Sequence, residues 1–206
     1  LQANGTNIAF SGIRVPRVID WNNDGKLDLL IGAGGYVWLY LNNGITNAPS
    51  FAAGVKVQAA GVDIYAGSTS SSPITLADMT GDGVKDLVMT DSSNKLRVYR
   101  NTAASNATPV YAAYTVVNTP AGTNFISPDR RFDLGDWDGD GKPDLVTGTF
   151  SGSVQLFLNS GTASDPRFST SSSLFSDSYQ LYPRVFDLNG NGLVDLLRGI
   201  NWGNVV

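Results

Sequence analysis

The sequence predicts an all-β fold in which four-stranded antiparallel units repeat around an axis, as in a β-propeller. Three observations lead to this prediction. A ten-residue acidic motif recurs along the chain, short apolar strands flank each copy, and the composition favours strands and turns. The 206 residues include 23 Gly and no Glu, and Val, Thr and Ser are abundant. Such residues prefer pleated strands and tight turns to helices.

The recurring motif has the form Asp-x-(Asn/Thr/Asp)-x-(Asp/Asn)-Gly-x-x-Asp-Leu. Its copies lie 58, 58 and 51 residues apart and start at Asp20, Asp78, Asp136 and Asp187. A unit reused at such a period indicates a repeat protein. We expect one propeller region over residues 1–206, with repeats at about 7–60, 61–118, 119–176 and 177–206, the last of them incomplete.

Each motif lies between strand signals. A first strand precedes it, with expected ranges 16–20, 73–78 and 183–187. A second follows it, at 27–32, 87–89, 145–148 and 196–199. A third ends in Asn, at 37–42, 96–101 and 154–159. The second and third strands carry apolar groups on both faces, which indicates sheets covered on both sides.

A proline followed two residues later by an aromatic residue comes after each third strand, at Pro49/Phe51, Pro109/Tyr111 and Pro166/Phe168. Since proline is tolerated at strand starts and edges, we expect the outer edge strands there. The repeat is then a four-stranded blade. A β-sandwich would need alternating polar and apolar faces, which the second and third strands lack, and a solenoid repeat is usually shorter.

The prediction amounts to about three and a half blades, whereas a propeller ring takes 4–8. Residues 1–6 are expected to be the end of an outer strand, and the sequence stops where the third strand of the fourth unit should begin. Either a missing segment of a longer parent chain or a partner chain in a homodimer would complete the ring.

The motif offers oxygen ligands at the spacing that Ca²⁺ requires. Positions 1, 3, 5 and 9 supply side-chain oxygens, position 7 supplies a backbone carbonyl, and Gly at position 6 permits the tight turn. The expected ligands of the first two loops are Asp20, Asn22, Asp24, Lys26 and Asp28, and then Asp78, Thr80, Asp82, Val84 and Asp86. Those of the last two are Asp136, Asp138, Asp140, Lys142 and Asp144, and then Asp187, Asn189, Asn191, Leu193 and Asp195.

Up to four calcium ions are therefore expected, one in each loop. Their affinity should follow the carboxylate number, so the third loop binds most tightly and the fourth most weakly. The EF-hand is excluded, because it needs Glu at position 12, where this chain has Ile31, Met89, Thr147 and Arg198. The alternative is a set of Asx-turn hairpins that hold no ion.

The composition excludes several functions. With no Cys and no His, the chain has no disulfide, no ordinary zinc site and no Ser-His-Asp triad. The 14 basic residues form no stripe, which argues against nucleic-acid binding, and no apolar run is long enough for a membrane span. We expect no enzymatic activity. Weak calcium sites fill where calcium is millimolar, which favours an extracellular or cell-surface location.

Some residues outside the acidic loops have two interpretations. The four tryptophans, Trp21, Trp38, Trp137 and Trp202, either stack on sugar rings or, as we expect, pack between blades. Arg17 and Arg184 recur in Pro-Arg-Val and are expected to be surface or inter-blade ion pairs. The charged segment 129–133 is interpreted as solvated structure.

The four acidic loops, each followed by a strand, a Gly-rich turn and another strand, resemble the FG-GAP/VCBS repeat, the blade of integrin α-chain-like propellers. The resemblance covers nearly the whole chain, although the Phe-Gly-Gly-Ala-Pro signature itself is echoed only loosely at residues 32–35. It implies a propeller with structural calcium between the first two strands of each blade. It also implies recognition of glycans or proteins, with two alternatives: a structural subunit of a surface or extracellular assembly, or an accessory domain of a polysaccharide-active enzyme.

Overall fold

The computed structural model describes residues 1–10, 15–45, 47–65, 73–104, 107–117, 131–149, 151–162, 165–177 and 181–200. Every regular element in these ranges is a β-strand, and neighbouring strands within each sheet pair antiparallel. The described ranges contain no helix long and apolar enough to cross a membrane. The all-β prediction is therefore confirmed.

Three four-stranded sheets follow one another along the chain, and each is a meander whose strands pair in sequence order. The first blade comprises β3 (Val15–Ile19), β4 (Asp28–Ala33), β5 (Tyr36–Tyr40) and β6 (Val55–Lys56). The second comprises β9 (Ile74–Ala77), β10 (Asp86–Thr90), β11 (Leu96–Tyr99) and β12 (Thr115–Val116). The third comprises β13 (Arg131–Gly135), β14 (Asp144–Gly148), β15 (Ser153–Asn159) and β16 (Phe168–Ser176).

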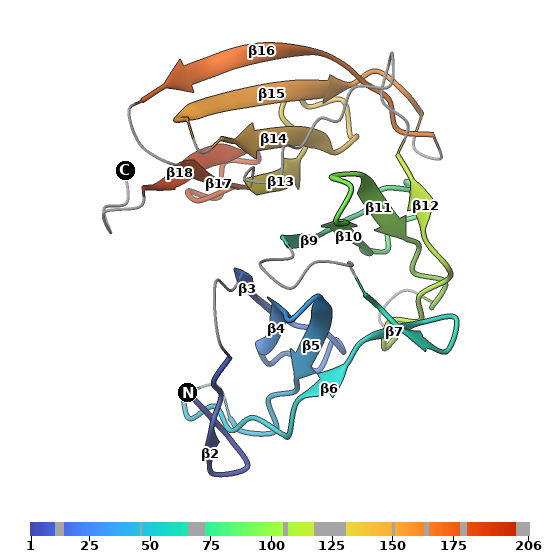
Figure 1. The fold of residues 1–206 in the computed structure, drawn as a ribbon, viewed down its shortest axis with the longest axis vertical. Helices are drawn as coiled ribbons and strands as arrows, with labels where there is room; N and C mark the ends of the chain where they lie inside the picture. The colour runs from blue at the N-terminus through green and yellow to red at the C-terminus, as the bar shows by residue number, and fades with distance from the viewer. Residues whose placement is uncertain are drawn as a thin grey trace.

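A fourth sheet has two described strands, β17 (Leu181–Phe186) and β18 (Asp195–Ile200). Figure 1 shows the four sheets fanned in an arc, with β3, β9, β13 and β17 on the inner side and β6, β12 and β16 at the periphery. The chain is thus a partial β-propeller, as predicted, and each acidic loop joins the first strand of a blade to the second.

The third strands differ from the prediction at their ends. β5 and β11 stop two residues before the expected Asn, so Asn42 and Asn101 lie outside the strands, whereas β15 reaches Asn159 as expected. The outer strands β6 and β12 begin later than the proline–aromatic signal and contain only two residues each. The aromatic residues of that signal instead form isolated bridges to the Asn residues, Phe51 to Asn42 and Tyr111 to Asn101.

Two hairpins were not predicted. Residues 1–6, expected to end an outer strand, instead belong to a hairpin of β1 (Gln2–Ala3) and β2 (Thr6–Asn7), so that expectation was wrong. A second hairpin, β7 (Gln58–Ala59) with β8 (Val62–Asp63), precedes the second blade. Their two-residue turns have left-handed backbones at Asn4-Gly5 and Ala60-Gly61, the geometry that a tight hairpin requires.

Each hairpin docks on the proline–aromatic segment of the blade that follows it. Ala3 forms a parallel bridge to Phe51, and Ala59 forms one to Tyr111. The signal in the sequence is a Gln-Ala-x-Gly repeat at residues 2–5 and 58–61, which is too short to be distinctive alone. The hairpins therefore belong to the repeat, and the second one joins the first blade to the second.

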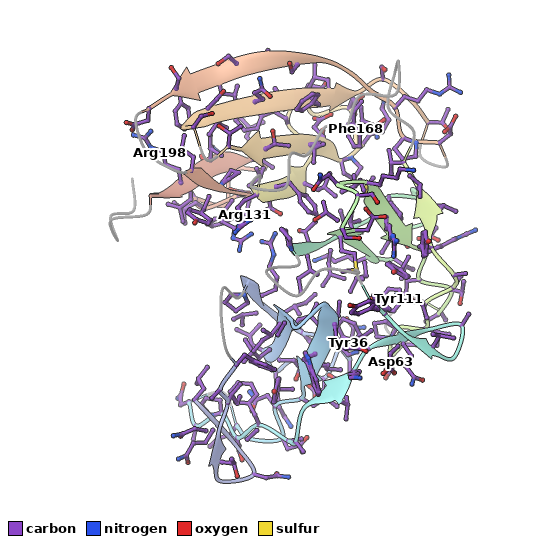
Figure 2. The ribbon with its side chains drawn as sticks, in the orientation of Figure 1. Tyr36, Asp63, Tyr111, Arg131, Phe168 and Arg198 are labelled. Carbon is purple, nitrogen blue, oxygen red and sulfur yellow. The ribbon has the colours of Figure 1, made fainter. Side chains whose placement is uncertain are left out.

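The hydrophobic core lies between blades. Leu30 and Val37 of the first blade pack with Ile74 and Leu87 of the second. Phe132 and Phe168 of the third blade pack in the same way against the second. Figure 2 shows Phe168 and Tyr111 directed into these inter-blade spaces. Since full burial of such a side chain is worth about 1.5–3 kcal/mol, these layers hold the arc together.

Replacing Phe132 with Ala should lower the free energy of unfolding by about 3–5 kcal/mol, because the 2% exposed ring fills the layer between the second and third blades. Urea unfolding measures the change. Leu158→Ala is the matched control, since this residue is 39% exposed on the same blade and should cost far less. Equal losses in the two variants would contradict the inter-blade core.

Candidate functional site

The four acidic loops share one hydrogen-bonded frame. The first aspartate of each loop accepts the backbone N–H of the glycine at position 6, at 2.9, 2.7, 2.9 and 2.8 Å along the chain. That glycine has a left-handed backbone in every loop. Position 5 then accepts the N–H of position 7, at 2.9, 3.0, 2.9 and 2.8 Å. These Asx bonds fold each loop into a series of tight turns.

The aspartate at position 9 fixes the loop to its blade. It is almost fully buried in the first three loops, as Asp28, Asp86 and Asp144. One carboxylate oxygen accepts the backbone N–H of position 2, at 2.9, 3.0 and 2.8 Å. The other accepts the N–H of the Asn after the third strand, at 2.7, 2.8 and 2.7 Å. Asp195 of the fourth loop makes the bond to position 2, at 2.9 Å.

The aspartate at position 9 and the Asn at the end of the third strand together form what we call the latch of each blade. These Asn residues were not predicted as site residues. Asn42, Asn101 and Asn159 are each about 4% exposed or less. Each amide donates to the carbonyl of loop position 8, and each amide oxygen accepts two backbone N–H groups of the following connection. The signal in the sequence was the Asn that closes each third strand.

Electrostatics divide the loop carboxylates into two groups. Burial raises the pKa of Asp86 and of Asp144, so keeping these groups ionised costs free energy. The exposed carboxylates at position 5 have cationic neighbours instead: Lys142 Nζ lies 2.7 Å from Asp140, and Arg100 lies 3.4 Å from Asp82. The ammonium of Lys142 lowers the pKa of Asp140.

The donor set fits a hard divalent cation. In the third loop, oxygens of Asp136, Asp138 and Asp144 all lie within 4.8 Å of one another, a group that the other described loops do not match. In the second loop, the Oγ1 of Thr80, an expected ligand, is buried beside the carboxylate of Asp82, which is another expected ligand. All twenty expected ligand residues lie in the described loops, while the ligand assignment itself remains a prediction.

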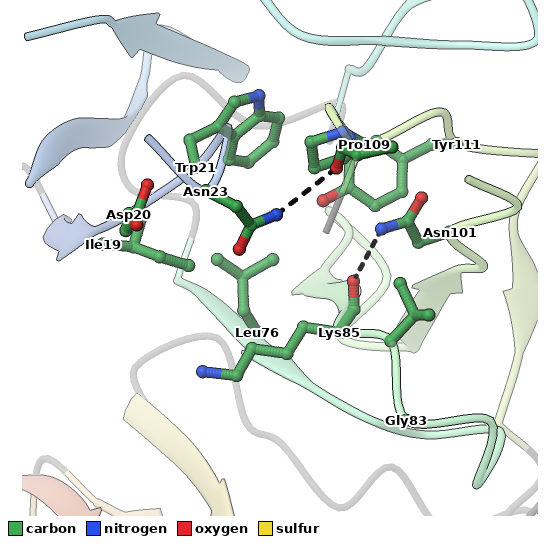
Figure 3. A pocket seen from close by; sticks show the side chains of 12 residues that line it. Ile19, Asp20, Trp21, Asn23, Leu76, Gly83, Lys85, Asn101, Pro109 and Tyr111 are labelled. Carbon is green, nitrogen blue, oxygen red and sulfur yellow. Dashed lines mark hydrogen bonds between the residues drawn. The ribbon is translucent and has the colours of Figure 1, made fainter. Parts of the chain in front are cut away.

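A pocket of about 170 Å³ lies between the first and second blades (Figure 3). Its walls come from both acidic loops, through Asp20 and Asn23 of the first and Val84 and Lys85 of the second. Tyr111 borders the same space, and its buried hydroxyl has no hydrogen-bond partner among the described residues. Because burial raises the pKa of Tyr111, this hydroxyl stays neutral and able to donate.

Asn23 distinguishes this pocket from the rest of the repeat. Its backbone is left-handed (φ 58°), and the other three loops have glycine at the same position, Gly81, Gly139 and Gly190. Asn is one of the few residues besides glycine that adopt this conformation. Its side chain points across the blade boundary, with Nδ2 3.5 Å from the carbonyl oxygen of Ala107 (Figure 3). The first loop thus places an amide where the others have none.

The tryptophans pack between elements and do not form exposed stacking platforms. Trp21 is 5% exposed, and its ring centroid lies 5.7 Å from that of Tyr111. Trp38 is half-buried and lies 5.9 Å from Phe10, and Trp137 packs against the core of the third blade. Packing between blades is confirmed for Trp21 and Trp137, whereas Trp38 packs within the first blade and against the segment that precedes it, and Trp202 lies outside the described residues.

An ion-pair network crosses the inner side of the arc. Arg17 of β3 forms two hydrogen bonds to Asp133 of β13, at 2.7 and 3.2 Å, and Thr75 of β9 donates to the same carboxylate at 2.7 Å. The inter-blade role expected for Arg17 is confirmed. The solvated role expected for residues 129–133 is wrong for Asp133, which is 3% exposed, because the strand directs it to the axis and not to the loop.

Comparisons with known proteins agree with this architecture. The FG-GAP-like repeat family matches residues 20–89, 78–147 and 136–197. None of the curated protein sequences compared with the chain matches it significantly.

Among solved structures, the chain is similar to a lectin from Agrocybe aegerita described as recognising non-reducing terminal N-acetylglucosamine, with 21% identity and a TM-score of 0.54. The match covers 95% of this chain and 48% of the lectin, so the chain spans about half of that protein's length. A second similar structure is the Photorhabdus luminescens Tc holotoxin pore, with 20% identity and a TM-score of 0.50, covering 92% of this chain and 8% of that one.

Replacing Asn42 with Ala should lower the free energy of unfolding by about 1–3 kcal/mol, since it leaves buried backbone groups of the latch without partners. Chemical denaturation measures the loss. Asn43→Ala is the control, because Asn43 is adjacent but exposed and should change stability little. Indistinguishable unfolding curves for the two variants would argue against the latch.

Proposed function

This chain belongs to the FG-GAP-like repeat family, and from that premise we propose that it is part of a calcium-stabilised propeller that recognises glycans through a pocket between its blades. The observation that carries the proposal is the pocket between the first two blades, where polar groups from two acidic loops meet the unpartnered hydroxyl of Tyr111. As a whole, the fold and family support a recognition or structural module.

Calcium is the ion that this proposal assigns to the loops. Oxygen donors alone, in loops that leave room for variable coordination, suit a hard cation of its size. A cation beside Asp86 and Asp144 would offset the free-energy cost of their buried charges. The residues to hold it are those at positions 1, 3, 5, 7 and 9 of each loop. We propose an extracellular or cell-surface location, where calcium is millimolar.

The pocket suits a small neutral polar ligand such as a sugar residue. Hydroxyl groups need donors and acceptors at fixed places, and Asn23, Lys85 and the Tyr111 hydroxyl provide them on a rigid frame. Ile19 and Leu76 add apolar surface for the ring face. The lectin with the same fold recognises a terminal N-acetylglucosamine, which makes that sugar a natural first probe.

Catalysis has less support. General acid–base work would fall on Asp, Lys, Tyr or Arg, since the chain has neither His nor Glu. The loop carboxylates are committed to backbone hydrogen bonds in each repeat, as expected of a structural frame. We propose that the remaining blades of the ring come from a longer parent chain or from a second copy.

Chelation of calcium should lower the melting temperature. Ion binding to the folded state stabilises it by about 2.7 kcal/mol when the free ion exceeds its Kd a hundredfold. Asp140→Ala, which removes a carboxylate from the third loop, should reduce the difference between melting curves in calcium and in chelator. Asp165→Ala, outside the loops, should keep it. Identical curves for the unsubstituted chain in calcium and in chelator would refute the structural metal.

Glycan binding is tested with a glycan array and calorimetry in millimolar calcium, with N-acetylglucosamine as the first soluble probe. Asn23→Gly gives the first loop the glycine of the other three, so the fold should persist while the affinity falls about fivefold to tenfold through loss of one hydrogen bond. Asn94→Gly is the matched control, since Asn94 also has a left-handed backbone but lies away from the pocket.

No glycan bound by the unsubstituted chain would reject the carbohydrate proposal and favour a protein ligand or an assembly role. Binding that is identical in Asn23→Gly would show that the pocket between the first two blades is not the site. Neither outcome tests the calcium prediction, because the melting curves that test it are measured without any glycan.

A further inference from the structure

One strand position on the inner side of the arc carries Arg in two units and other polar residues in the other two. It lies three residues before the first aspartate of each acidic loop, in β3, β9, β13 and β17. The residues there are Arg17, Thr75, Asp133 and Arg184. The first three form the network described above, in which both carboxylate oxygens of Asp133 accept hydrogen bonds. Its oxygens accept from Arg17, from Thr75 and from the backbone N–H of Val185 at 3.1 Å.

Arg184 forms no hydrogen bond within this network of described residues. It is only partly exposed, and no described residue accepts a hydrogen bond from its guanidinium. Burial and the nearby charge of Arg17 lower the pKa of Arg184, and the carboxylate of Asp133 offsets part of this effect. A guanidinium stays protonated in proteins, and the nearby carboxylate of Asp133 is already paired with Arg17.

A cavity of about 430 Å³ opens beside this residue. Arg17, Arg184, Lys85 and Asp133 supply its charged groups, and all four inner strands or their loops contribute to its wall. Arg17 neutralises Asp133, and Lys85 has no ion-pair partner among the described residues. The cavity therefore carries an excess of two positive charges in a partly enclosed space, where electrostatic attraction is stronger than in open water.

We propose that this axial cavity binds an oxyanion group, a sulfate, phosphate or carboxylate, through Arg184 with Lys85 at its rim. The planar guanidinium offers two parallel N–H donors that match such a group. Lys85 adds a flexible point charge from the second acidic loop. This site is separate from the glycan pocket, although the two share Ile19, Leu76 and Lys85 in their walls.

The test uses the 206-residue chain in calcium, with sulfate added at constant ionic strength against chloride. Calorimetry should show saturable sulfate binding. Arg184→Gln should weaken it about tenfold or more, since a charge-assisted pair is worth about 1.5–3 kcal/mol. Arg184→Lys should keep part of the affinity, and Arg167→Gln, at an exposed ion pair outside the cavity, should keep all of it. Phenyl phosphate and acetate then rank the three oxyanions.

No saturable binding of any of the three anions would overturn the proposal. So would equal affinities in Arg184→Gln and in the unsubstituted chain, which indicate a general salt effect. Near-ultraviolet circular dichroism of Arg184→Gln checks that the variant is folded. Because no glycan takes part, the result is independent of the carbohydrate proposal.

Discussion

The buried aspartate at position 9 of each acidic loop is the constraint on which the architecture depends. Asp28, Asp86 and Asp144 begin the second strand of their blades and accept hydrogen bonds from two backbones at once. One donor belongs to the loop and the other to the end of the third strand. A single carboxylate thus holds three consecutive parts of a blade together, and the closing Asn extends the same connection to the outer strand.

This latch has an electrostatic cost that shapes the rest of the loop. A carboxylate with almost no solvent contact is costly to ionise, and in the second and third loops other carboxylates lie nearby and raise the cost. Backbone N–H groups offset part of it. A bound cation would offset more, which links the metal proposed for these loops to the cohesion of the blade. The same rigidity fixes the wall of the inter-blade pocket, since Asp20 and Val84 belong to the loops.

The repeat, the blade and the place of the acidic loops could be predicted from the sequence, because each follows from patterns that span about ten residues. Asp20 and Gly25 predict a turn, and the alternating side-chain types that begin at Val37 predict a strand. Contacts between residues far apart in the sequence could not be predicted in this way. Arg17 and Asp133 are 116 residues apart, and only the curvature of the arc brings them together. The hairpins were missed because Gln-Ala-x-Gly is weak without the aromatic residue on which each one docks.

In a repeat protein, the positions that break the repeat indicate function more clearly than those that keep it. Residues needed for folding recur, as the latch aspartates do, because every blade has the same local problem to solve. Asn23 stands where three loops have glycine, in a left-handed backbone conformation that Asn tolerates better than most residues. Arg184 places a second cation on an axis where one ion pair is already complete. Asn23 and Arg184 both face a cavity. Stability accounts for the common frame, and ligand contact is the role that we propose for these two residues.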